Sequence, residues 1–333
     1  MLIWLAFVLC LAVIGVAGVK LSHYADAIAD KTGVGRTWVG LVLLATITSL
    51  PELVTGVSSV TVAQVPEIAL GDVLGSCVFN MLIIVVLDFL HRGETMYSQA
   101  APGHILAGGF GIMLIGIAGF SILISAIDLP LAIGHVGLYT PVILLTYAVA
   151  MRTVFRYEAR QVRDFTERAP DKYPGLTTTA IIVRYAIAAA FVVVAGIFLP
   201  FIGEGLAEQM GWNESFVGTL FVAFVTSVPE LVVTVAALRL GALDMAIGNL
   251  FGSNLFNIMI LAIDDLLFIQ GPLFSHVSTS HAISALSAIM MTAMAVVGFF
   301  YRPNHRLAGT VGWSSIFLVI VYALNTLTLY IHG

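Results

Sequence analysis

The sequence TSLPELV at residues 48–54 returns as TSVPELV at residues 226–232. A second motif, GDVLGSCVFN at 71–80, returns as GNLFGSNLFN at 248–257. The first pair is offset by 178 positions and the second by 177, so the second copy has lost one residue between its motifs. Two separated motifs that recur in the same order are not a chance match. The repeat predicts a chain built from two related halves.

The composition indicates that both halves lie in a membrane. Hydrophobic residues make up 59% of the 333 residues, charged residues make up 10%, and the mean hydropathy is +1.03. A soluble domain carries roughly 25% charged residues, so this chain has too few charges to cover a surface that faces water. The composition therefore excludes an ordinary soluble protein.

Long apolar stretches recur along the whole chain. A helix that crosses a bilayer needs about 20 mainly apolar residues, and we expect ten such helices. The predicted spans are residues 3–19, 37–62, 67–88, 104–126, 130–151, 179–201, 215–238, 243–268, 281–301 and 307–331.

A polar stretch separates the fifth predicted span from the sixth. Its cations are Arg152, Arg156, Arg160, Arg163, Arg168 and Lys172. The sequence therefore predicts a five-helix half over residues 1–151, a basic linker over 152–178, and a second five-helix half over 179–333.

The positive charges predict the orientation of the spans, because cytoplasmic loops are enriched in Lys and Arg. When ten spans alternate in direction, all 14 Lys and Arg residues of the chain fall on one side of the membrane. The other side carries Asp128, Glu204, Glu208 and Glu214 instead. We therefore expect the linker to be cytoplasmic and both termini to lie outside.

Five helices per half is an odd number, which fixes the relation between the halves. The second half must enter the membrane upside down relative to the first, as in many secondary transporters. The expected fold class is an all-α membrane protein with ten transmembrane helices in two inverted five-helix repeats.

Glu52 and Glu230 each fall in the middle of an otherwise uncharged span. A charged side chain at the bilayer centre costs about 2.5–3.5 kcal/mol on insertion scales, so each acid must face a protein-lined or watery cavity. The structural alternative is a protonated Glu bonded to a neighbouring helix. That explanation would have to apply twice, at equivalent positions, and we interpret the two acids as cation ligands.

A proline precedes each acid, at Pro51 and Pro229. Proline has no N–H and clashes with the carbonyl four residues back, so it kinks or breaks the helix. Broken helices supply backbone oxygens to ions near the membrane midplane. The alternative is a simple kink. Beside a buried acid, we expect the nearby carbonyls of Ala45 and Ala223 to contribute to an ion site.

Helical spacing places further oxygen atoms beside the acids. Residues three and four positions before each Glu share its face of the helix, and the second motif adds a Ser and an Asn four residues apart. The candidate side chains are Thr48, Ser49, Glu52, Ser76, Asn80, Thr226, Ser227, Glu230, Ser253 and Asn257.

This set contains only oxygen ligands, without His or Cys. Oxygen ligands suit hard cations such as Ca²⁺, Na⁺ or Mg²⁺ rather than Zn²⁺ or Cu⁺. Two carboxylates neutralise one divalent ion, and monovalent ions or protons could replace that ion on the return. The set therefore has a physical basis for exchange.

At these residues the chain resembles the sodium/calcium exchanger family, of the cation/Ca²⁺ exchanger superfamily, in its prokaryotic form. TSLPEL and TSVPEL look like its signature on the second and seventh helices, and GSCVFN and GSNLFN like that on the third and eighth. The resemblance implies four clustered ion positions, with Glu52 and Glu230 as the main Ca²⁺ ligands beside Asn80 and Asn257. The hydroxyls and the two alanine carbonyls would complete the Na⁺ shells. It also implies that the first and sixth helices slide to alternate access.

One residue departs from the family pattern. Many members carry Asp at the position of Asn257. Asn keeps a neutral oxygen ligand but removes a titratable group, which leaves the ion stoichiometry and the proton sensitivity open. The linker, about 25 residues long, is too short for a Ca²⁺-sensing domain.

These observations predict an antiporter, not an enzyme, in a prokaryotic plasma membrane, that exchanges Ca²⁺ for Na⁺. We expect inorganic cations as substrates, membrane lipid as surroundings, no cofactor and no nucleic-acid partner, and the oligomeric state stays open. Exchange of Ca²⁺ or another divalent cation for H⁺ is the alternative, because the two acids could titrate.

A channel fits less well because channels usually close a filter by oligomeric symmetry. A hydrolase fits less well because no His or Lys base lies at helical spacing from a nucleophile.

Four further aspartates lie near predicted helix ends: Asp72, Asp88, Asp264 and Asp265. We expect them at the membrane surface, where charged side chains remain solvated. For Asp72 the alternative is a minor role in ion entry.

Overall fold

The structure is a computed structural model, and it describes residues 2–91, 94–125, 127, 131–165, 172–173, 175–210, 222–303, 306–307 and 310–332. These residues are almost entirely helical, apart from one short antiparallel hairpin of two strands. The prediction of an all-α protein is therefore confirmed, with the hairpin as a small exception.

The first half of the described chain contains helices, π-helical segments (η1 and η2) and the hairpin. They are α1 (Leu2–Thr32), α2 (Arg36–Trp38), η1 (Val39–Leu44), α3 (Ala45–Thr48), α4 (Leu50–Ser58), η2 (Ser59–Ala63), α5 (Pro66–Leu90), α6 (Met96–Gln99), α7 (Gly103–Ser125), β1 (Ala132–Ile133), β2 (Val136–Gly137) and α8 (Tyr139–Phe165).

The elements of the second half, within the described residues, are all helices apart from an isolated bridge between Leu307 and Val311. They are α9 (Thr178–Met210), α11 (Val222–Thr226), α12 (Val228–Arg239), α13 (Leu243–Leu267), the 3₁₀ helix η4 (Leu273–His276), α14 (His281–Tyr301) and α15 (Trp313–His332).

Eight helical segments in the described part are long and apolar enough to cross a membrane. They coincide with all of the predicted spans except 130–151 and 215–238. Helix α8 covers most of residues 130–151, but its second half carries arginines. The other span is divided between α11 and α12, and its first residues lie outside the described part of the chain.

Two predicted boundaries were wrong. Helix α1 continues to Thr32 instead of ending at residue 19, because the charged Asp26 in its extension is neutralised inside the protein. The Asp26 carboxylate accepts hydrogen bonds from Arg36 Nε at 2.6 Å and from Lys172 Nζ of the linker at 2.8 Å. Helix α8 begins only after the hairpin and continues to Phe165, so the first part of the predicted linker is helical.

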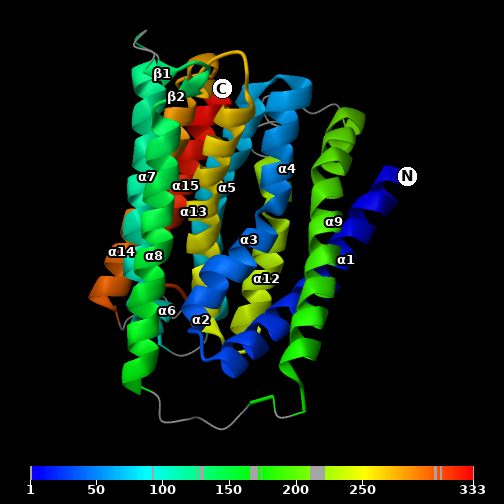
Figure 1. The fold of residues 1–333 in the computed structure, drawn as a ribbon, viewed down its shortest axis with the longest axis vertical. Coiled ribbons are helices and arrows are strands. Elements are labelled where there is room, and N and C mark those ends of the chain that lie inside the picture. Colours follow the sequence, from blue (N-terminus) through cyan, green and yellow to red (C-terminus); the bar gives the residue numbers. More distant parts are fainter. Residues whose placement is uncertain are drawn as a thin grey trace.

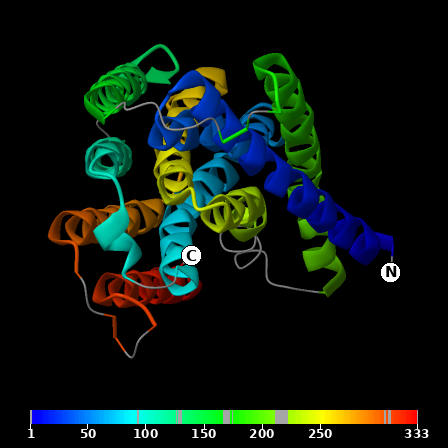
Figure 2. The same cartoon turned by 90° about the horizontal axis from the view of Figure 1, so that it is seen from below.

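The helices form a central group flanked on two sides (Figure 1). Helices α5 and α13 lie at the centre, with the broken helices α3–α4 and α11–α12 packed against both of them. Helices α1 and α9 lie side by side along one edge, and α7, α8 and α14 lie on the opposite side (Figure 2).

Helix α13 is the most enclosed element. Its most apolar window is 89% buried, whereas that of α1 is 17% buried, so α1 is peripheral. Two glycines allow α13 to approach α2 and the π-helical segment η1 closely. A Cβ atom at Gly252 would meet the Leu41 carbonyl oxygen at 2.2 Å, and one at Gly248 would meet the Thr37 carbonyl oxygen at 2.6 Å. A larger residue at either position would force these helices apart.

Candidate functional site

The predicted helix breaks are present in both halves. Ser49 separates α3 from α4 with backbone angles φ −91° and ψ 10°, and Ser227 separates α11 from α12 with φ −81° and ψ 4°. The proline follows two residues later in each case, at a position where a helix tolerates a missing N–H. The same sequence motif therefore produces the same backbone conformation twice.

Glu52 and Glu230 lie in the first turn of the helices that follow these breaks. The partial positive charge at a helix N-terminus favours a carboxylate there. Both side chains are completely buried. They are also linked by a hydrogen bond, because Ser49, three residues before Glu52, donates to Glu230 Oε1. The expectation that the two acids meet inside the protein is thus met by the geometry.

Hydrogen bonds join each acid to the opposite half or to the central helices. Ser49 Oγ donates to Glu230 Oε1 at 3.0 Å, so the first broken helix contacts the acid of the second. Ser253 Oγ donates to the same oxygen at 3.4 Å, and Ser76 Oγ donates to Glu52 Oε1 at 3.4 Å. The motifs of both halves therefore form one buried cluster.

Ser227 and the two threonines belong to the same cluster. Ser227 Oγ donates to Ser76 Oγ at 3.1 Å. Thr226 Oγ1 donates to Asp72 Oδ1 at 2.8 Å, and Thr48 Oγ1 donates to Asn249 Oδ1 at 3.4 Å. All four predicted Ser and Thr positions on the broken helices are therefore buried at the centre.

Asp72 and Asn249 are site residues that the sequence did not assign correctly. Asp72 was expected at the membrane surface, but it is fully buried, because α5 begins at Pro66 and carries it one turn into the protein. Asn249 occupies the equivalent position in the second half and donates from Nδ2 to Thr234 Oγ1 at 3.0 Å. The repeat offset of 177 would have pointed to this pair.

Several buried oxygens of the cluster have no hydrogen-bond partner among the described residues. They are Glu52 Oε2, Glu230 Oε2, Asp72 Oδ2 and Asn80 Oδ1. A buried polar atom without a partner costs about 1–3 kcal/mol. A cation among these atoms would remove that cost, and hard cations take oxygen ligands of this kind. The residues therefore fit a hard cation as substrate.

The two predicted Asn ligands have different surroundings. Asn80 Nδ2 donates to Asn254 Oδ1 at 3.0 Å, and Asn254 Nδ2 donates to the Cys77 carbonyl at 3.1 Å. Asn257 instead lies against the Cys77 thiol. Its amide makes no other hydrogen bond within the described part of the chain. The sequence did not lead us to predict a role for Asn254, although it is a polar residue inside a repeated motif of an apolar span.

The carbonyls of Ala45 and Ala223 already accept hydrogen bonds within their own helices. The Ala45 oxygen accepts from Ser49 N at 3.0 Å, and the Ala223 oxygen accepts from Ser227 N at 3.2 Å and from Thr226 Oγ1 at 3.1 Å. Their role as ion ligands stays a prediction.

Helix α9 contacts the cluster through Gly196. A Cβ atom there would lie 2.6 Å from Pro51 Cγ and 3.6 Å from Pro229 Cγ. Helix α1 makes a similar contact, because a Cβ atom at Gly18 would lie 2.8 Å from Val232 Cγ1. Gly196 of α9 therefore touches the prolines of both breaks, whereas Gly18 of α1 touches α12 beyond its break.

The expected surface position of the three remaining aspartates was wrong. Asp88 accepts from Gly312 N at 2.6 Å and Ser315 Oγ at 2.7 Å, which fastens the start of α15. Asp265 accepts from Tyr139 and Thr140 hydroxyls at 2.5 Å each, which fastens the start of α8.

The third of these aspartates, Asp264, is fully buried against Gly56. Neither of its carboxylate oxygens has a hydrogen-bond partner among the described residues. Both helix ends are buried because segments distant in the sequence pack over them. Tertiary structure of this kind leaves no signal in the local sequence.

Sequence comparison places these motifs in a known group. Residues 2–155 and 180–331 match the family described as "Sodium/calcium exchanger protein". Inner membrane protein YrbG of Escherichia coli is 27% identical over 246 residues, which cover 73% of this chain and 72% of that protein. Sodium/calcium exchanger MaX1 of Methanosarcina acetivorans is 27% identical over 277 residues, with 73% and 77% covered.

The fold is also known. A solved structure of the sodium-calcium exchanger NCX_Mj aligns with this chain at a TM-score of 0.73 and 19% identity, and the alignment covers 98% of both chains. At this level of identity the likeness shows a common fold.

Proposed function

Because this chain belongs to the sodium/calcium exchanger family, we propose that it exchanges Ca²⁺ for Na⁺ across the membrane by alternating access. The observation that supports this best is the buried cluster around Glu52 and Glu230. Two acids from separate motifs meet there, and each keeps one carboxylate oxygen that has no hydrogen-bond partner among the described residues.

The charge of the two glutamates suits one divalent ion. Ca²⁺ takes six to eight oxygen ligands and is often held by carboxylates together with neutral oxygens. Glu52 and Glu230 would neutralise its charge, and Asn80 would add an amide oxygen. The hydroxyls of the broken helices, together with Ser76 and Ser253, would complete the shell of Ca²⁺ or of the Na⁺ ions that replace it. Asn257 would remain a neutral ligand at every pH.

We further propose the ten-helix arrangement of two inverted halves, with a cytoplasmic linker and both termini outside. The repeated helix breaks at Ser49 and Ser227 support it. So do the anchors at Asp88 and Asp265, which occupy equivalent positions at an offset of 177. Each anchor fastens the last helix of the other half.

The movement that alternates access would belong to α1 and α9. They contact each other along the edge of the protein, and Gly196 of α9 presents no side chain to the two prolines of the breaks. Two hydrogen bonds would have to break in such a shift: Ser22 Oγ of α1 donates to the Val233 carbonyl, and the Tyr185 hydroxyl of α9 donates to the Leu43 carbonyl, each at 2.9 Å. The core helices would then hold the ions while the two edge helices shift.

Exchange of Ca²⁺ for H⁺ is the second candidate. Related antiporters include the putative antiporter CaxA of Alkalimonas amylolytica, which is 23% identical over 240 residues. The acids of the cluster could carry protons in place of Na⁺. Two observations favour Na⁺: the hydroxyls that surround both acids, and a neutral Asn at position 257.

Isotopic Ca²⁺ uptake into proteoliposomes would test the coupling ion. We expect uptake when an outward Na⁺ gradient is imposed at equal pH, and none from a pH gradient without Na⁺. Uptake driven by the pH gradient alone would replace Na⁺ by H⁺ in the proposal. Flux that needs no ion on the opposite side would indicate a channel.

A further inference from the structure

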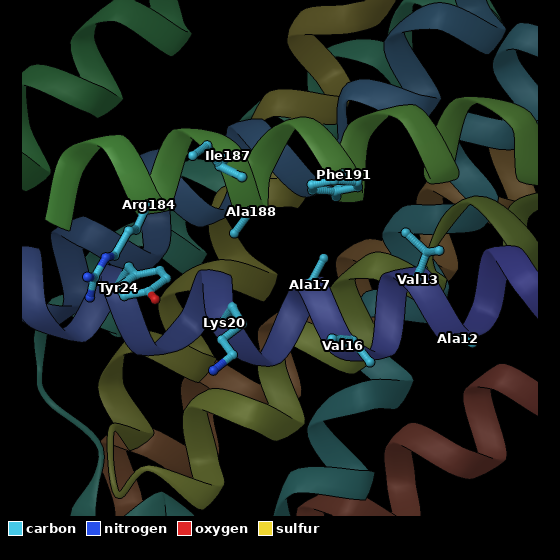
Figure 3. A pocket seen from close by; sticks show the side chains of 10 residues that line it. All are labelled: Ala12, Val13, Val16, Ala17, Lys20, Tyr24, Arg184, Ile187, Ala188 and Phe191. Atoms are coloured by element: carbon cyan, nitrogen blue, oxygen red, sulfur yellow. The ribbon is translucent and has the colours of Figure 1, made fainter. Parts of the chain in front are cut away.

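A groove runs along the outside of the protein between α1 and α9. Its volume is about 570 Å³. Its walls are formed mainly by apolar side chains, including Val13 and Val16 of α1 and Ile187 and Phe191 of α9 (Figure 3). In a bilayer such a groove faces lipid, so an acyl chain fits its walls.

One end of the groove is different from the rest. Lys20 and Arg184 line it there, and Figure 3 shows the Arg184 side chain beside Tyr24, at the end away from Phe191. Both cations are exposed. Neither makes a hydrogen bond or ion pair with any residue that the structure describes.

The charged end lies on the linker side of the membrane. Arg184 is in the second turn of α9, which begins at Thr178 directly after the linker. At a rise of about 1.5 Å per residue, Arg184 lies about 9 Å from that helix start, and a long Arg side chain at this distance extends toward the headgroups. The cytoplasmic leaflet carries anionic lipids, which attract cations near the membrane surface.

We propose that this groove is a binding site for an anionic phospholipid. One acyl chain lies along the apolar walls, and the phosphate is held by Lys20 and Arg184. The two cations complement the negative headgroup, and the apolar walls complement the chain. Because α1 and α9 form both walls, the bound lipid contacts the two helices that are proposed to move.

Native mass spectrometry of the full-length, delipidated protein would test this site without relying on transport. The protein is titrated separately with phosphatidylglycerol and phosphatidylcholine. We expect the wild type to retain phosphatidylglycerol at least about tenfold more strongly, since each Lys or Arg near an anionic lipid is worth about a fivefold preference. Lys20→Gln combined with Arg184→Gln should remove that preference.

Arg239→Gln is the matched control, because Arg239 is an exposed cation at the end of α12, away from the groove. It should keep the wild-type preference. A second variant, Ala188→Trp, fills the groove and should reduce retention of both lipids. Equal retention of the two lipids by the wild type would overturn the proposal, and so would an unchanged preference in the double variant.

A separate observation concerns the amides between α5 and α13. A backbone carbonyl can only accept a hydrogen bond, so the Cys77 carbonyl must receive the Nδ2 group of Asn254. Asn254 Oδ1 therefore faces Asn80, which must offer its own Nδ2. As a result, Asn80 Oδ1 points away from Asn254 and has no other partner among the described residues.

From this chain of bonds we infer that Asn254 is a positioning residue, which fixes the Asn80 amide with its oxygen toward the cation. This inference rests on the proposed role of Asn80 as a ligand. The other half lacks the device, because Cys77 occupies the equivalent position beside Asn257. The two Asn ligands therefore differ in how firmly they are oriented.

A double-mutant cycle on Ca²⁺ affinity would test the inference. Asn254→Ala frees the Asn80 amide to turn its NH₂ group toward the cation, and we expect the KM for Ca²⁺ to rise about tenfold with little change in kcat. Asn80→Asp presents an oxygen in either orientation, so adding Asn254→Ala to it should change KM less than about twofold.

The same factor in both backgrounds would show that Asn254 is merely structural. Asn80→Ala distinguishes the remaining case. If that variant keeps wild-type KM, Asn80 is not a ligand, and both its proposed role and the positioning by Asn254 are wrong. The exchange activity itself would still stand.

Discussion

Substitution of Gly196 tests whether α9 must move across the helix breaks. A Cβ atom at Gly196 would lie 2.6 Å from Pro51 Cγ, whereas an ordinary van der Waals contact is 3.4–4 Å. Pro51 is rigid and part of the break, so α9 itself must shift by roughly 1 Å to accept the methyl group. Overpacking of this kind costs about 1–3 kcal/mol.

That cost applies to this conformation and not equally to the one in which α9 has moved. A bias of 1–3 kcal/mol changes a two-state equilibrium by a factor of about 5 to 150. We therefore expect Gly196→Ala to lower the maximal rate of Ca²⁺ exchange in proteoliposomes at least about fivefold. Ca²⁺ binding to the detergent-solubilised protein should change little, because the proposed ligands belong to the other helices.

Gly15→Ala is a matched control, because no atom lies within 4 Å of a Cβ added at Gly15 in α1. It should exchange Ca²⁺ at the wild-type rate. If Gly196→Ala also exchanges Ca²⁺ at the wild-type rate, exchange does not require α9 to move across the helix breaks. If both variants are slow, the effect belongs to glycine substitution in general.

Three other substitutions follow from the contacts. Ser49→Ala removes a 3.0 Å hydrogen bond to Glu230 Oε1. Hydrogen bonds to charged groups are worth about 1.5–3 kcal/mol, so the affinity for Ca²⁺ should fall at least about tenfold. Ser58→Ala, outside the cluster, is the control and should leave the affinity unchanged. Asp265→Ala removes the carboxylate that accepts hydrogen bonds from the Tyr139 and Thr140 hydroxyls. The loss should destabilise the protein by about 3 kcal/mol or more and lower its melting temperature. An unchanged melting temperature would show that Asp265 does not anchor the start of α8. Asn257→Asp adds a carboxyl group that binds cations only when it is ionised, so Ca²⁺ transport should persist but weaken as the pH falls. If the transport rate has the same pH profile as in the wild type, position 257 does not face the ions.

The sequence was sufficient to predict the centre of the protein. A carboxylate in an apolar span has to meet a polar partner, and a repeated motif supplies that partner from the other half. For this reason the sequence alone could place Glu52 and Glu230, with the serines and threonines beside them, in one buried cluster, and their role as cation ligands stays a prediction. Their spacing depends only on helical geometry.

What the sequence could not supply depends on contacts across the fold. Asp88 and Asp265 resemble surface residues until segments distant in the sequence pack over the helix ends. The orientation of the Asn80 amide is set by Asn254 on a different helix. Helix α1 continues beyond residue 19 and through Asp26 because Arg36 and Lys172 neutralise the Asp26 carboxylate, and Lys172 lies 146 residues away in the sequence.

The central claim is that the acids of the two halves act as one cation site. The most direct measurement is Na⁺-driven Ca²⁺ uptake by Glu52→Gln and Glu230→Gln, each reconstituted and confirmed as folded by its melting temperature. Both variants keep the shape of the side chain but lose one of the two glutamate carboxylates proposed to hold Ca²⁺, so each should abolish uptake. Wild-type uptake by either variant would contradict the account.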